Sequence, residues 1–270
     1  MNRIDAKFHA LRAAGQKGFV AYICAGDPNL RTTAQLARAF ERVGVDVLEL
    51  GVPFSDPLAD GLVNQLAAER ALRSGTTLNG VLKTVASLRR GGLRVPVVFY
   101  AYYNVLHHHG LKKFVRDAAV AGVDGVLALD LPPEEANGYE RFMKQAGLHP
   151  IYLVAPTTPP ERIRKIARHA SGFIYYVSRE GVTGMQRSLA PAVTAHVAAI
   201  RRHSKLPVAI GFGISTPAQA RAAARVGDAV VVGSAIVNQI AKHSRDRRVA
   251  ERVARFVAAM VRGVKRRDTQ

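Results

Sequence analysis

Residues 45–50 read Val-Asp-Val-Leu-Glu-Leu, an apolar and β-branched run, and residues 51–61 that follow read Gly-Val-Pro-Phe-Ser-Asp-Pro-Leu-Ala-Asp-Gly. A run that breaks into a loop rich in proline and glycine is typical of a buried strand and the turn after it. Seven further runs share its character: FVAYIC (19–24), VPVVFY (95–100), VDGVLAL (123–129), HPIYLV (149–154), FIYYV (173–177), LPVAIGF (206–212) and DAVVVG (228–233). Their continuous apolar character indicates strands of a parallel sheet that is covered on both faces.

The spacing of these eight runs predicts the fold. Each gap between neighbouring runs holds enough chain for at least one crossover helix, so strand and helix alternate. Eight such units predict an α/β protein with a (β/α)8 TIM barrel, formed by residues 1–270 as a single domain. Extra helices are predicted at the N-terminus, after the second strand and at the C-terminus. An open doubly wound sheet is the alternative, which the lack of Gly-x-Gly-x-x-Gly after the first run disfavours.

A weak internal repeat supports the barrel. Gly44, Gly122 and Gly227 each stand just before an aspartate that leads into an apolar run. A glycine at such a place is typical of a helix end, and the aspartate turns the chain into the next strand.

The charge of the chain is unusual, because it is +19 at pH 7. Residues 241–270 alone hold ten Lys and Arg against three acidic residues, and their apolar residues fall at helical spacing. We therefore expect a terminal helix with a basic solvent face. A basic surface attracts polyanions. No motif of a zinc finger, an RNA-binding aromatic platform or a basic zipper is present, so a solvated surface is favoured over specific nucleic-acid binding.

Cysteine use and hydropathy predict the compartment. The sole cysteine, Cys24, rules out an internal disulfide and is expected to be a small core residue. Charged residues interrupt the N-terminal segment, and no apolar run approaches the roughly 18 residues of a membrane span. These features predict a cytoplasmic protein with no membrane partner. Residues 107–109, three adjacent histidines, are expected to form an exposed loop, and no metal site is predicted.

Glu49 lies inside the apolar run 45–50, where an unpaired carboxylate is unfavourable. Loss of solvation raises a carboxyl pKa toward neutrality and suits the group to donate and accept protons. A structural ion pair to a neighbouring strand is the alternative. Asp56 and Asp60 follow in the next loop, and a buried and a loop carboxylate can hold different protonation states, which predicts an acid/base pair of Glu49 and Asp60. Capping of the following helix is the alternative for Asp60.

Glycine-rich turns follow the last three predicted strands. They are GVTG (181–184), GFGIS (211–215) and GSA (233–235). Backbone N–H groups of such turns, together with the start of a helix at Ser234, can surround an anion, and barrels often bind phosphate after their last two strands. No Walker-type Gly-Lys-Ser/Thr motif is present, so hydrolysis of a nucleoside triphosphate is disfavoured.

Aromatic residues gather at the predicted strand ends on the same rim. They are Tyr22, Tyr100, Tyr102, Tyr103, Tyr175, Tyr176 and Phe212. Flat apolar ligands fit between such rings, although ordinary barrel core is the alternative for some of them. Beside a phosphate site, these rings predict a pocket for an aromatic compound with a phosphorylated tail.

The chain closely resembles the tryptophan synthase alpha subunit family in six segments, in order and spread over nearly its whole length. They are AGDP (25–28), LELGVPFSDPLADG (48–61), YYN (102–104), SREGVTG (178–184), GFGIS (211–215) and GSAIV (233–237). The resemblance implies a lyase of tryptophan biosynthesis that cleaves indole-3-glycerol phosphate to indole and glyceraldehyde 3-phosphate by a retro-aldol reaction. It also implies a beta subunit partner in an α2β2 complex. Pyridoxal phosphate is then expected only in the beta subunit, with no cofactor in this chain.

Residue roles are implied by the same resemblance. Glu49 is expected to move protons at the indole C3 and the glycerol hydroxyl, and Asp60 to accept a hydrogen bond from the indole N–H. Thr183 belongs to a loop that is expected to close over the site, fix Asp60 and exclude water. The residues expected to bind phosphate are Gly184, Gly213, Gly233 and Ser234. Those expected on the ring side of the substrate, from the resemblance or the aromatic rim, are Tyr22, Tyr100, Tyr102, Tyr175 and Phe212.

Pro53, Asp56 and Asn104 match positions that face the beta subunit in the family. Four residues depart from the family pattern, although none of them is a proposed acid or base: Cys24, Leu62, Tyr100 and Val105. Two alternatives stay open. One is a barrel that has lost turnover and acts mainly as an allosteric partner of the beta subunit, and the other is a free-standing lyase.

Overall fold

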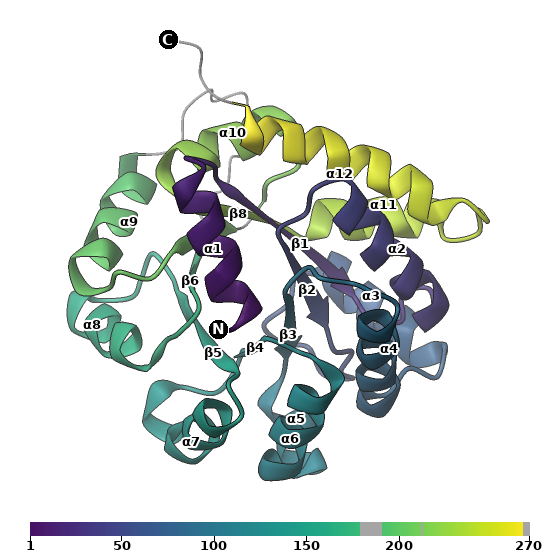
Figure 1. Ribbon diagram of the computed structural model, residues 1–270, viewed down its shortest axis with the longest axis horizontal. Helices are drawn as coiled ribbons and strands as arrows, with labels where there is room; N and C mark the ends of the chain where they lie inside the picture. The colour runs from purple at the N-terminus through teal and green to yellow at the C-terminus, as the bar shows by residue number, and fades with distance from the viewer. Residues whose placement is uncertain (179–190, 212, 267–270) are drawn as a thin grey trace.

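The computed structural model describes residues 1–178, 191–211 and 213–266 and shows a closed parallel barrel (Figure 1). Each strand pairs with the next, and β8 pairs with β1. The strands are β1 (Gly18–Cys24), β2 (Val47–Gly51), β3 (Val97–Ala101), β4 (Gly125–Ala128), β5 (His149–Val154), β6 (Ile174–Val177), β7 (Val208–Gly211) and β8 (Ala229–Val232). Each falls on a predicted run, and the predicted barrel is confirmed.

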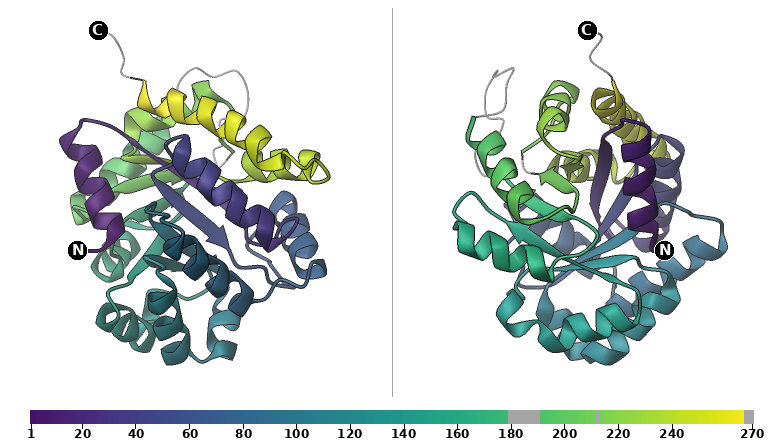
Figure 2. Two further views of the ribbon diagram at one scale, coloured as in Figure 1. Left: turned by 45° about the vertical axis from the view of Figure 1, so that its right-hand side comes forward. Right: turned by 60° about the vertical axis from the view of Figure 1, so that its left-hand side comes forward.

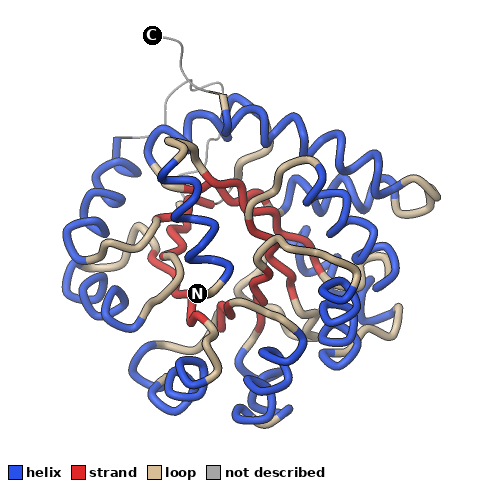
Figure 3. The backbone as a smooth tube through the Cα atoms, in the orientation of Figure 1, coloured by secondary structure: helices blue, strands red, loops and turns tan. Residues whose placement is uncertain are grey.

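Helices surround the strands on all sides (Figure 3). In the described residues they are α1 (Arg3–Ala13), α2 (Leu30–Arg42), α3 (Leu62–Arg73), α4 (Leu78–Arg90), α5 (Tyr103–His109), α6 (Leu111–Ala121), the 3-10 turn η1 (Pro133–Glu135), α7 (Asn137–Gln145), α8 (Pro160–His169), α9 (Pro191–His203), α10 (Pro217–Val226), α11 (Ser234–His243) and α12 (Val249–Lys265). α1 precedes β1, two helices follow β2, and two follow β8. The extra helices are therefore present at the three predicted places.

Side chains alternate between the barrel interior and the outer layer along each strand. In β2, Val47 packs in an interior cluster with Val98 of β3, whereas Leu48 and Leu50 pack in the larger layer between strands and helices. Glu49 follows the same alternation as Val47, and its side chain therefore points into the barrel. Burial on both faces explains why the runs in the sequence are continuously apolar.

α1 fills the end of the barrel at which the strands begin. Ile4, Phe8 and Leu11 of α1 join the interior cluster, and the ring centroids of Phe8 and Phe173 lie 5.8 Å apart. Figure 1 shows α1 in purple, crossing in front of the strands, and Figure 2 shows the same arrangement from two further directions. The opposite end, where the strands finish, is the end at which loops carry chemistry in such barrels.

Aspartates tie neighbouring strands together at the filled end. Asp46, Asp124 and Asp228 stand just before β2, β4 and β8, and each carboxylate accepts a hydrogen bond from a backbone N–H near the start of the preceding strand. The donors are Phe19 at 2.9 Å, Val97 at 2.8 Å and Val208 at 3.0 Å, in the same order. Such charge-assisted bonds fix where each strand begins.

Asp46 also joins the first and last helices. Its Oδ1 lies 3.7 Å from Nζ of Lys7 in α1, and its Oδ2 lies 2.7 Å from Nζ of Lys265 in α12. α12 packs against α2, α10 and α11 (Figure 1). It buries Val249, Val253, Ala254, Val257, Met260, Val261 and Val264. The predicted terminal helix is confirmed, and no described helix is long and apolar enough to cross a bilayer.

The three histidines at residues 107–109 are not in the exposed loop that the sequence analysis predicts. They form the end of α5, and Nε2 of His109 lies 2.9 Å from Oδ2 of Asp117 in α6. The ring of His109 also packs edge-on against Phe114. His109 therefore holds α5 against α6. Within the described residues, no three His, Cys, Asp or Glu side chains gather as metal ligands would.

Candidate active site

Glu49 places a carboxyl group inside the barrel with no hydrogen-bond partner in the described part of the chain. Its register neighbours are Tyr22 in β1 and Val98 in β3. The residue is 1% exposed, and neither carboxylate oxygen has a hydrogen-bond partner among the described residues. Burial, and after it the nearby negative charge of Asp60, raises the pKa of Glu49 to about 8. The group can therefore give or take a proton near neutral pH, and the alternative of a structural ion pair is not seen in these contacts.

Asp60 ends the loop after β2 and turns its carboxylate toward β3. Oη of Tyr100 donates to Oδ1 at 2.8 Å, Oη of Tyr102 donates to Oδ2 at 3.0 Å, and Nδ2 of Asn64 reaches Oδ1 at 3.3 Å. The N-cap of α3 is Gly61, with no side-chain capping bond, so Asp60 does not cap that helix. Burial raises the pKa of Asp60, and the three donors oppose that rise.

The two carboxyl groups therefore lie in contrasting surroundings. Glu49 has no donor among the described residues, whereas Asp60 has three. Such a contrast separates the protonation states of two nearby acids. It favours a neutral Glu49 beside an ionised Asp60, and their use as an acid/base pair stays a prediction.

Two strand glycines leave room for tyrosine hydroxyls in the barrel mouth. A Cβ atom at Gly51 would lie 2.5 Å from Oη of Tyr22, and one at Gly211 would lie 2.6 Å from Oη of Tyr175. The rings of Tyr22 and Tyr100 pack edge-on, with centroids 5.0 Å apart. Burial raises the pKa of all three tyrosines well above the ordinary value, so their hydroxyls stay protonated. Neutral donors and aromatic faces together suit a flat heteroaromatic ligand.

The predicted anion site lies on the neighbouring strand ends. Gly213 follows β7 with a φ of +69°, and Ser234 opens α11 directly after β8. The first N–H groups of a helix have no intrahelical partner and attract an anion. Ile236 and Val237 both donate their N–H to the carbonyl of Gly233, which fixes the first turn of α11.

Tyr22 lies between the predicted anion site and the buried acid. Its ring lies against Gly233, where a Cβ atom would be 3.3 Å from Cδ1 of the tyrosine. In β1 the same residue is the register partner of Glu49 in β2. The glycine turn after β8 and the carboxyl of β2 therefore face the same end of the barrel from either side of one tyrosine.

The remaining predicted residues divide into three groups. Pro53 is buried, whereas Asp56 and Asn104 are exposed on the loop after β2 and on α5. Thr183, Gly184 and Phe212 lie outside the described residues. Cys24 is buried beside Tyr22, Ala67, Ala68, Ala71 and Val237, and it is the small core residue that was expected.

Asn64 was not predicted as part of the site. It lies in the first turn of α3 and donates to Asp60, four residues before it in the sequence. A spacing of four residues at a helix start is a usable signal, because it places the two side chains on the same face. From the sequence, acid/base chemistry or helix capping is expected of Asp60, and no role is expected of Asn64.

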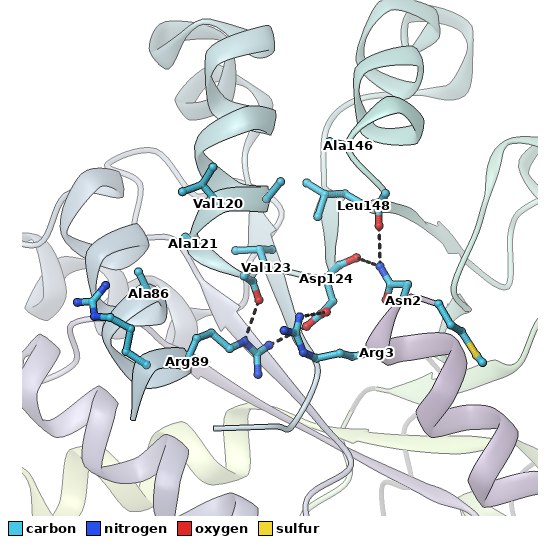
Figure 4. A pocket seen from close by; sticks show the side chains of 15 residues that line it. Asn2, Arg3, Ala86, Arg89, Val120, Ala121, Val123, Asp124, Ala146 and Leu148 are labelled. Atoms are coloured by element: carbon cyan, nitrogen blue, oxygen red, sulfur yellow. Dashed lines mark hydrogen bonds and ion pairs between the residues drawn. The ribbon is translucent and has the colours of Figure 1, made fainter. Parts of the chain in front are cut away.

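A separate groove lies at the other end of the barrel, where the strands begin (Figure 4). It has a volume of about 590 Å³. Asp124 accepts from Nη1 of Arg3 at 2.9 Å and from Nη2 of Arg89 at 2.7 Å. Arg89 also donates to the carbonyls of Gly122, Leu93 and Val95. Arg3, Arg89 and Asp124 are paired with one another at this groove, which lies at the end opposite to the site at the strand ends and is assigned to the framework.

Comparisons with known proteins identify relatives over the full chain. The family model described as "Tryptophan synthase alpha chain" matches residues 8–265. The tryptophan synthase alpha chain of Opitutus terrae is 52% identical over 267 residues, which covers 98% of this chain and 100% of the relative. That of Geotalea daltonii is 49% identical over 264 residues, with 98% and 99% covered. The crystal structure of tryptophan synthase subunit alpha from Legionella pneumophila superposes with a TM-score of 0.90 at 38% identity, and 98% of each chain is covered.

Proposed function

The chain belongs to the tryptophan synthase alpha chain family, and we propose that Glu49 and Asp60 are the residues with which it carries out the reaction of that family. It is a lyase of tryptophan biosynthesis that cleaves indole-3-glycerol phosphate to indole and glyceraldehyde 3-phosphate. The observation that carries the residue assignment is the buried carboxyl of Glu49, which has no hydrogen-bond partner among the residues that the structure describes, near the hydrogen-bonded Asp60. We further propose that residues 1–270 act as one barrel domain in the cytoplasm.

Glu49 is proposed to move the protons of the reaction. Breaking the bond between the indole ring and the glycerol chain requires a proton on the indole C3 and the loss of the proton from the adjacent hydroxyl. With its pKa raised to about 8, Glu49 begins protonated and gives its proton to C3. The carboxylate then takes the hydroxyl proton as the carbon–carbon bond breaks and the hydroxyl carbon becomes the aldehyde. The electron pair of that bond restores the aromatic ring, and Glu49 ends protonated as it began.

Asp60 is proposed to stabilise the charge that appears on the ring. Protonation of C3 places positive charge on the ring nitrogen, and a carboxylate that accepts a hydrogen bond from this N–H lowers the energy of that state. The attraction between this carboxylate and the positive ring is stronger at a buried position than in water. Asp60 is already surrounded by donors that favour its ionised form.

The phosphate of the substrate is proposed to lie at the turns after β7 and β8. Gly213, Gly233 and Ser234 supply close backbone approach and the start of α11. Gly184 and Thr183 are proposed to join them, and Phe212 to line the ring side. Tyr175 and Tyr22 then lie between the phosphate end and the acid, because each borders a strand glycine in the mouth.

A tryptophan synthase alpha chain has a beta subunit partner, and we propose an α2β2 complex in which only the beta subunit binds pyridoxal phosphate. Asp56 and Asn104 are exposed on the rim where this partner is expected. Leu58, in the same loop as Asp56, is 82% exposed, and Leu62 at the start of α3 is 69% exposed. Adjacent exposed leucines on a polar rim are typical of an interface. Pro53, buried behind them, is proposed to shape the loop.

Indole release from indole-3-glycerol phosphate, measured with and without a beta subunit, tests these proposals. The unaltered chain is expected to release indole in both conditions, and faster with the partner. Glu49→Gln is expected to lower kcat by at least 10²-fold with little change in affinity for glycerol 3-phosphate. Glu69→Gln, an exposed change of the same type on α3, serves as the matched control and is expected to keep full activity.

The outcomes separate the alternatives. A chain that releases no indole but stimulates the beta subunit is a regulator. A chain with high activity alone and no complex is a free-standing lyase. A fully active Glu49→Gln variant removes Glu49 from the reaction.

A further inference from the structure

Two tyrosines donate hydrogen bonds to the carboxylate of Asp60, and they differ in their other contacts. Tyr102 donates to Oδ2 of Asp60 and also accepts the N–H of Ala59 at 2.9 Å, so it is bonded to the backbone of the same loop. Tyr100 donates to Oδ1 from β3 itself. One tyrosine therefore bonds the loop and its carboxylate together, and the other bonds the carboxylate to the barrel.

Tyr100 is itself fixed in position by the strands around it. It is the register partner of Gly51 in β2 and of Leu127 in β4. Its ring packs edge-on against Tyr22, whose hydroxyl occupies the space that the missing side chain of Gly51 leaves. A donor held by three strands cannot follow the loop, so the bond to Oδ1 sets where the carboxylate lies.

We propose that Tyr100 is a positioning residue that anchors the Asp60 carboxylate to the barrel and keeps it ionised before substrate arrives. The inference rests on the proposed role of Asp60 in the reaction. A carboxylate that is already placed and charged needs no reorganisation when positive charge forms on the ring.

The polar groups around Asp60 make this bond important. Glu49 faces it from β2, Tyr22 and Cys24 from β1, and Tyr175 from β6. The amide of Asn64 faces it from α3. Among the described residues, no cation is a cause of the pKa shift of Asp60, so hydrogen-bond donors are what favour its ionised form. Without the Tyr100 hydroxyl the pKa of Asp60 rises, and a less charged Asp60 allows the pKa of Glu49 to fall. The pKa values of Asp60 and Glu49 are thus expected to shift in opposite directions.

Tyr100→Phe in the full chain tests the proposal, because it removes only the hydroxyl. Carboxyl NMR titration without ligand is expected to show a higher pKa for Asp60 and a lower pKa for Glu49. The acid limb of kcat/KM for indole release is expected to move to higher pH, with a loss of about tenfold at pH 6. The base limb, which follows the loss of the Glu49 proton, is expected to move to lower pH, so the loss is smallest between the two limbs. KM is expected to change less than about twofold, since the phosphate site is untouched.

Tyr139→Phe is the matched control. Tyr139 is a buried tyrosine in α7 whose hydroxyl donates only weakly, to the carbonyl of Val126 at 3.5 Å. It is expected to leave both titrations and the pH profile unchanged. A thermal melt of each variant confirms that it is folded.

Two results overturn the inference: unchanged titration of both acids in Tyr100→Phe, or a loss of activity that is equal at every pH. Asp60→Asn distinguishes this failure from failure of the proposed function. If Asp60→Asn is inactive while Tyr100→Phe behaves as the unaltered chain, only the anchoring role is wrong. If Asp60→Asn keeps full activity, the assignment of Asp60 is itself wrong.

Discussion

Asp27 and Arg70 form a two-pronged ion pair between the loop after β1 and α3. Nε of Arg70 donates to Oδ1 of Asp27 at 2.8 Å, and Nη2 donates to Oδ2 at 2.8 Å. Asp27 is only 1% exposed, so this ion pair replaces the water that its carboxylate loses on folding. α3 also carries Asn64 and follows directly on Asp60. The pair therefore fixes the helix that borders the site.

Arg70→Ala is expected to destabilise the protein by about 2–3 kcal/mol, because it leaves a buried carboxylate without its partner. Denaturant unfolding measures this change. Arg73→Ala is the control on the same helix, since Arg73 pairs with Glu69 in solvent and is expected to cost less than about 0.5 kcal/mol. Equal losses in the two variants would show that Asp27 does not need its partner.

Glu49 is expected to make stability depend on pH. Its pKa is about 8 in the folded protein and 4.5 in its ordinary state, so the folded state holds more protons between these values. The stabilisation is complete below pH 4.5 and is lost as the pH rises toward 8, by up to about 1.4 kcal/mol per pH unit. The free energy of unfolding, measured across this pH range, should therefore change more steeply with pH in the unaltered protein than in Glu49→Gln. Parallel curves for the two proteins would contradict the raised pKa.

Gly51→Ala is expected to displace Tyr22 and Tyr100 at the end of the barrel where the strands finish. A Cβ atom there would lie 2.5 Å from Oη of Tyr22, and the displaced ring would move Tyr100. Displacement of about 1 Å in a catalytic group can lower the rate about 10²-fold. Indole release measures this loss. Gly138→Ala is the control, because nothing lies near that position in α7, and it is expected to keep activity and to gain up to about 1 kcal/mol in stability.

Phe8→Ala tests the filling of the barrel by α1. The side chain is buried in the interior cluster against Phe173, so its removal is expected to cost about 3–5 kcal/mol of unfolding free energy. Val120→Ala in α6 is the control, since Val120 is 83% exposed and its loss is expected to change stability by less than about 0.5 kcal/mol. A similar small effect at Phe8 would mean that α1 does not stabilise the barrel.

The strands and Glu49 could be predicted because their signals are local. Continuous apolar runs indicate strands that are buried on both faces. A glutamate within such a run is therefore shielded from solvent on whichever face of the strand it lies. The helix-ending glycines were a weaker signal. Gly44 and Gly122 have φ values of +89° and +87°, whereas Gly227 has a φ of −83°. An aspartate can therefore begin a strand without a left-handed glycine before it.

The tyrosine partners of Asp60 could not be predicted, because they depend on how a loop lies over a strand distant in sequence. Tyr100 and Tyr102 come from β3 and its end, forty and more residues beyond Asp60. The ion pair of Asp27 and Arg70 has the same character. Adjacent histidines give no periodic signal, so the sequence does not predict the helix that holds His109. Its contact with Asp117 depends on the packing of two helices.

The contacts of Asp46 make the first and last helices one cooperative unit. Its two oxygens meet a lysine from each of α1 and α12, and one of them also accepts the N–H of Phe19 in β1. Fraying of either helix is therefore expected to weaken the contact of Asp46 with the other helix and the contact between the first two strands. We expect local unfolding of the barrel to involve these three segments together. Amide hydrogen exchange should therefore proceed together in α1, α12 and the start of β1.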